Sequence, residues 1–162
     1  MSQSRILLLA PLMLAPAAAA EARIVGADAA ACAGGKPSLL VRVSGFKKPT
    51  GTVKVALYSA DNYLVKGGKL RKVVVPVQSG EPIDVCIAAP RAGNYAVAVH
   101  HDVNGNGKDA SDGAGFSGNP RLSITNLKPS FSRIAVQVGG APRPVAVVLQ
   151  YRSGLSIRPT NS

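Results

Sequence analysis

The residues best suited to chemistry lie in one polar stretch, HDVNGNGKDASDG, which runs from His101 to Gly113. It contains Asp-x-Asn-x-Asn-Gly, a spacing at which alternate side chains of a tight turn can point inward together. Calcium prefers six to eight oxygen ligands, supplied by carboxylates, amide oxygens and backbone carbonyls. The stretch therefore predicts a weak calcium site. Its ligands would be the side chains of Asp102, Asn104 and Asn106, the carbonyl of Lys108, and either Asp109 or Asp112.

The same stretch is also explained by turn formation without an ion. Asn and Gly tolerate positive φ and serve hairpin connections by themselves. An EF-hand is excluded, because position twelve of such a loop should be Glu and is Gly113 here, and no helical pattern flanks the loop. Two interpretations remain open, a calcium-braced loop and a hydrogen-bonded Asn-Gly turn.

Catalysis by this region would need a nucleophile beside a base, or two opposed carboxylates. Adjacent strand residues face opposite sides, so the neighbouring histidines cannot both serve one site. The sequence contains no Gly-x-Ser-x-Gly and no zinc-type histidine spacing, and we predict that the protein is not an enzyme. Loops on a rigid scaffold are nevertheless where ligands usually bind. The residues here that could contact a ligand are His100, His101, Phe116 and Asn119.

The elements that must position this loop are short valine-rich runs separated by Gly, Pro and Asn. Apolar and polar residues alternate with period two, as in half-buried antiparallel strands, and no window has a convincing helical pattern. Pro76 cannot donate a ladder hydrogen bond, so its run is expected at a sheet edge. The pattern predicts an all-β antiparallel two-sheet sandwich, immunoglobulin-like or prealbumin-like, of about seven strands. The runs are 38–46, 52–59, 70–78, 82–89, 94–102, 132–140 and 144–151.

The start of the chain is typical of a secretory signal peptide. Arg5 is the only charged residue among the first twenty, and an apolar run from Ile6 to about Leu14 precedes a string of alanines. The run is too short to cross a bilayer and contains Pro11. We therefore expect cleavage of residues 1–20 after Ala20, a periplasmic or secreted location, and no transmembrane segment in the mature protein.

Cys32 and Cys86 are the only cysteines in the sequence. In an oxidising compartment such an even pair usually forms a disulfide, and no Cys-x-x-Cys pair suggests metal or redox chemistry. Cys86 alternates with its apolar neighbours, so the disulfide is expected on the outer face of its sheet. It would pin an N-terminal segment, 21–38, to a sandwich domain, 39–152, which a flexible tail, 153–162, would follow.

The charge of the chain indicates the class of partner. The mature protein has 142 residues (162 less the first 20), of which 18 are basic and 8 acidic, giving +10. Such a surface favours anionic partners, including lipopolysaccharide, anionic lipid and acidic polysaccharide, although the dispersed cations also fit a merely solvated surface. Nucleic acid is not expected, because the protein is exported and offers no aromatic platform for stacking bases. We expect a monomer.

Part of the chain resembles a known family. The stretch AGNYAVAVHHDVNGNGK, followed by GFSGN, resembles the exported bacterial family known as domain of unknown function 2141. The strand TVKVALYS and the loop that reaches Tyr63 and Leu64 also fit this family. The resemblance implies a signal peptide and a compact β-sandwich, but no established activity. Members commonly place an acidic residue two positions after the lysine, where this chain has Ala110, with Asp109 one step earlier.

These features together indicate a binding role more than a catalytic one. We expect a periplasmic or envelope-associated binding or accessory module with a calcium-stabilised loop. Its partner would be an anionic envelope component or a glycan. The alternative is a purely structural envelope domain without a ligand.

Overall fold

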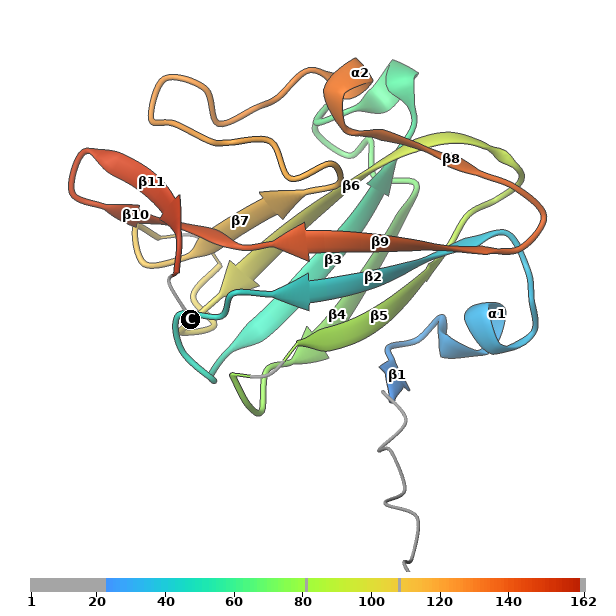
Figure 1. The fold of residues 1–162 in the computed structure, drawn as a ribbon, viewed down its shortest axis with the longest axis horizontal. Coiled ribbons are helices and arrows are strands. Elements are labelled where there is room, and N and C mark those ends of the chain that lie inside the picture. Colours follow the sequence, from blue (N-terminus) through green and yellow to red (C-terminus); the bar gives the residue numbers. More distant parts are fainter. Residues whose placement is uncertain (1–22, 81, 108, 161–162) are drawn as a thin grey trace, which may run out of the picture.

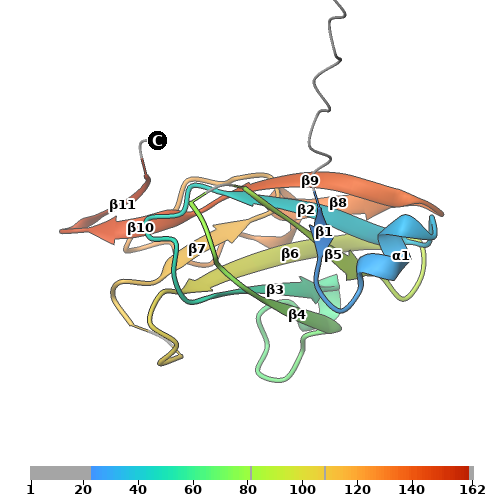
Figure 2. The same ribbon diagram turned by 90° about the horizontal axis from the view of Figure 1, so that it is seen from below.

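The protein folds as a sandwich of two β-sheets (Figures 1 and 2). The computed structural model describes residues 23–80, 82–107 and 109–160. The all-β sandwich expected from the alternating runs is confirmed, and the described part of the chain contains eleven strands. The predicted signal peptide, residues 1–20, lies outside the described residues, so its cleavage stays a prediction.

The smaller sheet has the strand order β1-β5-β2-β9. In this sheet β2 and β5 pair antiparallel, as expected, but β1 pairs with β5 and β2 pairs with β9 in parallel, which corrects the expectation of a purely antiparallel sandwich. Period-two alternation is the same for both directions, and strands joined by a long connection are free to run parallel. The strands are β1 (Ile24–Val25), β2 (Ser38–Ser44), β5 (Ile83–Ala88) and β9 (Pro142–Val148).

The larger sheet has the order β11-β10-β7-β6-β3-β4, and β8 pairs with β6 beside β7. As predicted from Pro76, β4 lies at the edge. The long strand β6 is central, with β3 along one side and β7 and β8 along the other. The strands are β3 (Thr52–Tyr58), β4 (Arg71–Pro76), β6 (Gly93–Asp102), β7 (Gly113–Phe116), β8 (Ala135–Val138), β10 (Gln150–Ser153) and β11 (Ser156–Pro159).

Several strands differ from the seven expected runs. The run 144–151 divides at buried Leu149 into β9 and β10, which belong to different sheets, as at a sandwich corner. Within the expected flexible tail, β11 pairs with β10 and so satisfies its backbone groups. The β7 segment lacks valine alternation because large side chains cover its glycines. A Cβ at Gly113 would lie 2.5 Å from Tyr151, and one at Gly115 would lie 2.6 Å from Val147.

The core lies between the sheets and consists of the residues that the alternation placed inside. They include Leu39, Val41, Val43, Val53, Val55, Leu57, Val85, Ile87, Val97, Val99 and Val147. In the part of the chain that the structure describes, three short helices lie outside the sheets: α1 (Ala29–Ala33), η1 (Ala60–Asn62) and α2 (Phe131–Ile134). None of the helices in the described residues is long and apolar enough to span a membrane.

The predicted disulfide between Cys32 and Cys86 is confirmed. Cys86 pairs in register with Leu40 on β2, and its side chain points away from the core, towards α1. Helix α1 contains Cys32 and covers this outer face of the smaller sheet, so both cysteines are buried. The disulfide therefore fastens the N-terminal segment to β5.

Candidate functional site

A groove of about 610 Å³ lies on the outer face of the larger sheet. Its floor consists of Ala56 on β3, Ala98 on β6 and Ala114 on β7. Ala56 lies opposite Ala98 in the ladder between β3 and β6, and Ala114 lies opposite His100, two residues further along β6. Three small side chains on neighbouring strands leave space above the sheet, and this space is the groove.

Apolar side chains from three directions form the walls of the groove. Tyr58 and Phe116 extend from the sheet, Leu64 comes from the loop after η1, and Leu127 comes from the segment between β7 and α2. Leu64 has a φ of 54°, a left-handed conformation that is strained for a bulky residue. Such strain persists where the surroundings fix it, and it concentrates at functional sites.

The end of the groove near the polar loop is charged. His100 Nε2 lies 2.8 Å from Asp112 Oδ2, and both residues line the groove. Lys54 also lines it, and its ammonium lies 2.6 Å from Asp102.

Two further lysines, Lys69 and Lys72, complete the rim of the groove. Both are exposed, and neither forms an ion pair with another residue in the described part of the chain. Within the described residues these two lysines therefore have no acidic partner, and the groove is also lined by the carboxylates of Asp109 and Asp112.

The Asp102 carboxylate organises the first half of the loop. It is almost fully buried and accepts hydrogen bonds from the Lys54 ammonium and from the backbone N–H groups of Gly105 and Gly107, at 2.6, 2.8 and 3.1 Å. The bond from Lys54 is the chief cause that lowers the pKa of Asp102, and the two backbone donors add to it against the opposing effect of burial. Asp102 is thus held as a carboxylate.

Asp109 organises the exposed tip of the loop. One of its oxygens accepts hydrogen bonds from the side-chain amides of Asn104 and Asn106. The other accepts from the hydroxyl and the backbone N–H of Ser111. These hydrogen bonds lower the pKa of Asp109 well below its ordinary value, and the bond from the Ser111 hydroxyl has the largest effect.

The predicted calcium ligands consequently lie in three hydrogen-bonded groups. Asp102 contacts Lys54, Asp109 contacts the two asparagines, and Asp112 contacts His100 and the backbone N–H groups of Val103 and Asp109. Lys108 lies outside the described residues. Within the described ranges no cluster of three or more His, Cys, Asp or Glu residues is suited to a metal. Calcium binding stays a prediction, and at Asp102 it would have to compete with Lys54.

The other ligand candidates separate into two pairs. His100 and Phe116 line the groove, whereas His101 faces the core on the opposite side of β6. Because a carbonyl only accepts, His101 Nε2 donates to Thr50 at 2.7 Å, and Nδ1 accepts from the Tyr151 hydroxyl at 2.6 Å. Asn119 binds the backbone of Ala146 and Val148 and so ties its loop to β9. His101 and Asn119 therefore hold the fold together.

Sequence reasoning missed most of the groove. The residues it did not single out are Lys54, Ala56, Tyr58, Lys69, Lys72, Ala98, Ala114 and Leu127. The available signal was the outward-facing set of small and basic residues in the runs 52–59 and 94–102. Their meeting depends on strand register, which the runs themselves do not show.

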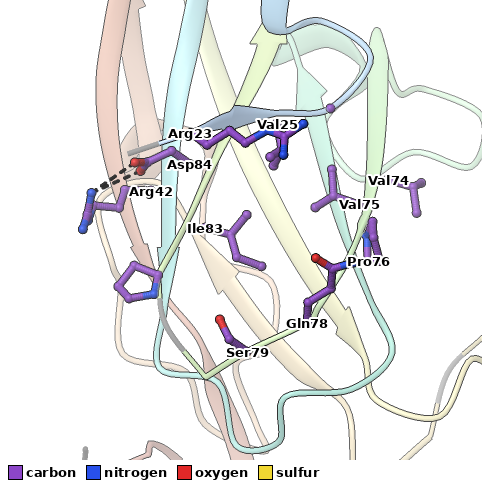
Figure 3. Close-up of a pocket in the computed structure, with 12 residues that line it drawn as sticks. Arg23, Val25, Arg42, Val74, Val75, Pro76, Gln78, Ser79, Ile83 and Asp84 are labelled. Carbon is purple, nitrogen blue, oxygen red and sulfur yellow. Dashed lines mark hydrogen bonds and ion pairs between the residues drawn. The ribbon is translucent and has the colours of Figure 1, made fainter. Parts of the chain in front are cut away.

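A second groove, of about 370 Å³, shares Asp109, Asp112, Ala114 and Leu127 with the first. A further cavity, of about 440 Å³, opens at the sandwich edge near β1, β4 and β5 (Figure 3). There Arg42 and Asp84 pair with each other at 3.1 Å. Because Lys69 and Lys72 at the alanine-floored groove have no acidic partner in the described residues, that groove is the stronger candidate site.

Comparison with known protein families gives a match that covers more than half of the chain. The model of the family described as "Uncharacterized protein conserved in bacteria (DUF2141)" matches residues 41–146. The chain belongs to this family. The DUF2141 match includes β3, β6 and β7 in full, and with them every residue that lines the groove. No curated protein and no solved structure matches the chain.

Proposed function

We propose that this DUF2141 protein is an exported binding module of the bacterial envelope and that its groove binds an anionic envelope component. The proposal depends on one observation, that the groove combines an apolar floor of alanines with a basic rim. Lys69 and Lys72 on this rim have no acidic partner in the described residues. Export is inferred from the first twenty residues.

The groove suits a ligand with an anionic group and an apolar body. Its volume of about 610 Å³ lies within the range of small-molecule sites, which are mostly apolar with a few placed polar groups. The alanines, Leu64 and Leu127 would contact the apolar part, and the lysines would pair with the charge. This arrangement favours a lipid-like amphiphile.

An acidic glycan is the less suitable ligand. Sugars are usually held by stacking on an open aromatic ring, but Tyr58 and Phe116 are only 4% and 6% exposed. Phe116 instead packs in a second cluster with Ala96, Leu122 and Ile134. Its ring closes that cluster over the sheet and leaves little face for a sugar.

Native mass spectrometry of the protein isolated from the periplasm tests the proposal. We expect an adduct whose mass is that of an acidic lipid. Ala98→Leu would fill the floor of the groove and remove the adduct. The matched control Ala146→Leu lies on the exposed side of β9, in the smaller sheet, and should keep it. A glycan mass would identify the other ligand class, and protein without any adduct would support a purely structural domain.

A further inference from the structure

A second surface with its own chemistry lies at the end of the sandwich, next to the groove. It consists of the β10–β11 hairpin and the segment 121–128 that precedes α2, which Figure 1 shows projecting on the same side. Ile124 and Leu127 from the segment, and Arg152 and Ile157 from the hairpin, line the second groove of about 370 Å³. The two segments are therefore neighbours.

This surface exposes large apolar side chains. Leu155, in the turn of the hairpin, is 82% exposed, while Leu127 and Ile124 are 52% and 49% exposed. Isolated exposed apolar residues are common, but grouped ones mark interaction sites. Two neighbouring projections that each present leucine or isoleucine form such a group.

The same surface is basic. No Asp or Glu occurs after Asp112, although the remaining residues include six arginines and lysines: Arg121, Lys128, Arg133, Arg143, Arg152 and Arg158. Four of these, Arg121, Lys128, Arg152 and Arg158, belong to the segment 121–128 or to the hairpin, and all four are exposed. Arg152 and Arg158 donate hydrogen bonds to a backbone carbonyl and a serine hydroxyl, both neutral. The charge is thus open to an external anion.

We propose that this surface docks the protein on an anionic lipid bilayer. Leu155 and Ile124 would enter the headgroup boundary, while the arginines and Lys128 would contact lipid phosphates. Basic residues near a membrane attract anionic lipid over about one Debye length. An acidic polysaccharide would satisfy the charges but leave the apolar side chains in water. The inference rests on the proposed envelope location, and it does not depend on the ligand of the groove.

Vesicle sedimentation of the mature protein tests this docking. We expect binding to vesicles of phosphatidylglycerol mixed with phosphatidylcholine, weakening as salt rises, and little binding to pure phosphatidylcholine. The double variant Ile124→Gln/Leu155→Gln should lower the partition coefficient at least fivefold. Val65→Gln is the matched control, because Val65 is 56% exposed in a different loop, and it should bind like the wild type.

The outcomes separate this proposal from that for the groove. Ala98→Leu should lose the groove ligand and keep vesicle binding, and Ile124→Gln/Leu155→Gln should do the reverse. Equal sedimentation of wild type and the double variant, with matching melting temperatures, would overturn the docking surface. So would equal binding to both kinds of vesicle. Retention on dextran sulfate without binding to vesicles would overturn it in favour of an acidic polysaccharide.

Discussion

The ammonium of Lys54 on β3 lies 2.6 Å from the carboxylate of Asp102, the last residue of β6. The pair joins neighbouring strands where the polar loop begins, and it gives an almost fully buried carboxylate a cation of the protein's own. The loop that resembles a calcium turn is therefore organised around an internal ion pair. Because this pair is charged, the stability of the protein should depend on pH, and Lys54 should compete with calcium for Asp102.

Acid should destabilise the protein through Asp102 and Asp28. Asp28 accepts hydrogen bonds from Arg71 and from the backbone N–H of Ala88, and the bond from Arg71 is the chief cause that lowers its pKa. Both folded-state pKa values lie below the ordinary 3.8. The folded protein therefore binds fewer protons than the unfolded chain in this range, so the stabilisation is present above about pH 4 and is lost as pH falls through the folded pKa values.

Urea unfolding at pH 7, 4 and 3 measures this effect. The free energy of unfolding should decrease most between pH 4 and pH 3, and Asp102→Asn should show a smaller decrease than the wild type. A free energy of unfolding that is unchanged over this range would contradict the assignment.

Calcium should stabilise Lys54→Met more than the wild type. Without the ammonium, Asp102 retains only its backbone donors, and its carboxylate becomes available to an external cation. Extracellular calcium sites of modest charge have Kd values of about 10⁻⁴–10⁻³ M. Calcium at about 2 mM should thus raise the Tm of this variant by mass action.

The matched control is Asp102→Asn/Lys54→Met, which should lose the calcium effect. If wild type and Lys54→Met respond equally to calcium and to chelator, Lys54 does not compete with the ion.

The disulfide should contribute a large part of the stability. It joins residues 54 apart in the sequence and fastens α1 to β5. Closing a loop of this length removes conformational freedom from the unfolded chain, and losing such a disulfide typically costs about 2–5 kcal/mol. Urea unfolding of Cys32→Ala/Cys86→Ala should show this loss. In the unreduced wild type, quantitative reaction of both cysteines with iodoacetamide would show that the pair is not bonded.

The sequence alone predicts which residues face the core. It does not predict contacts between residues that are far apart in the sequence. Alternation in 52–59 and 94–102 correctly assigns Val53, Val55, Val97 and Val99 to the interior, because burial alternates with the pleat. It cannot show that Lys54 meets Asp102, since their contact depends on the pairing of β3 with β6.

The alternation of apolar and polar residues also could not predict strand β7 or the direction in which β2 and β9 pair. In β7, Gly113 and Gly115 are needed because Tyr151 and Val147 occupy the space of a side chain, so the strand has no apolar pattern to detect. Parallel pairing of β2 with β9 has the same periodicity as antiparallel pairing. The disulfide was predictable, since the sequence has two cysteines, which allow one connection, and its first residues predict export to an oxidising compartment.

The dissociation constant of a short-chain anionic phospholipid tests the groove most directly. Isothermal titration of the mature protein with dihexanoyl phosphatidylglycerol, kept below its micelle concentration, measures binding without a bilayer. We expect the anionic lipid to bind more tightly than dihexanoyl phosphatidylcholine, with Kd raised at least tenfold by Ala98→Leu and raised also by Lys72→Glu. Lys36→Glu, an exposed charge reversal at a residue that does not line the groove, should leave Kd unchanged. Equal Kd values for wild type and Ala98→Leu, or for the anionic and zwitterionic lipids, would contradict binding in the groove.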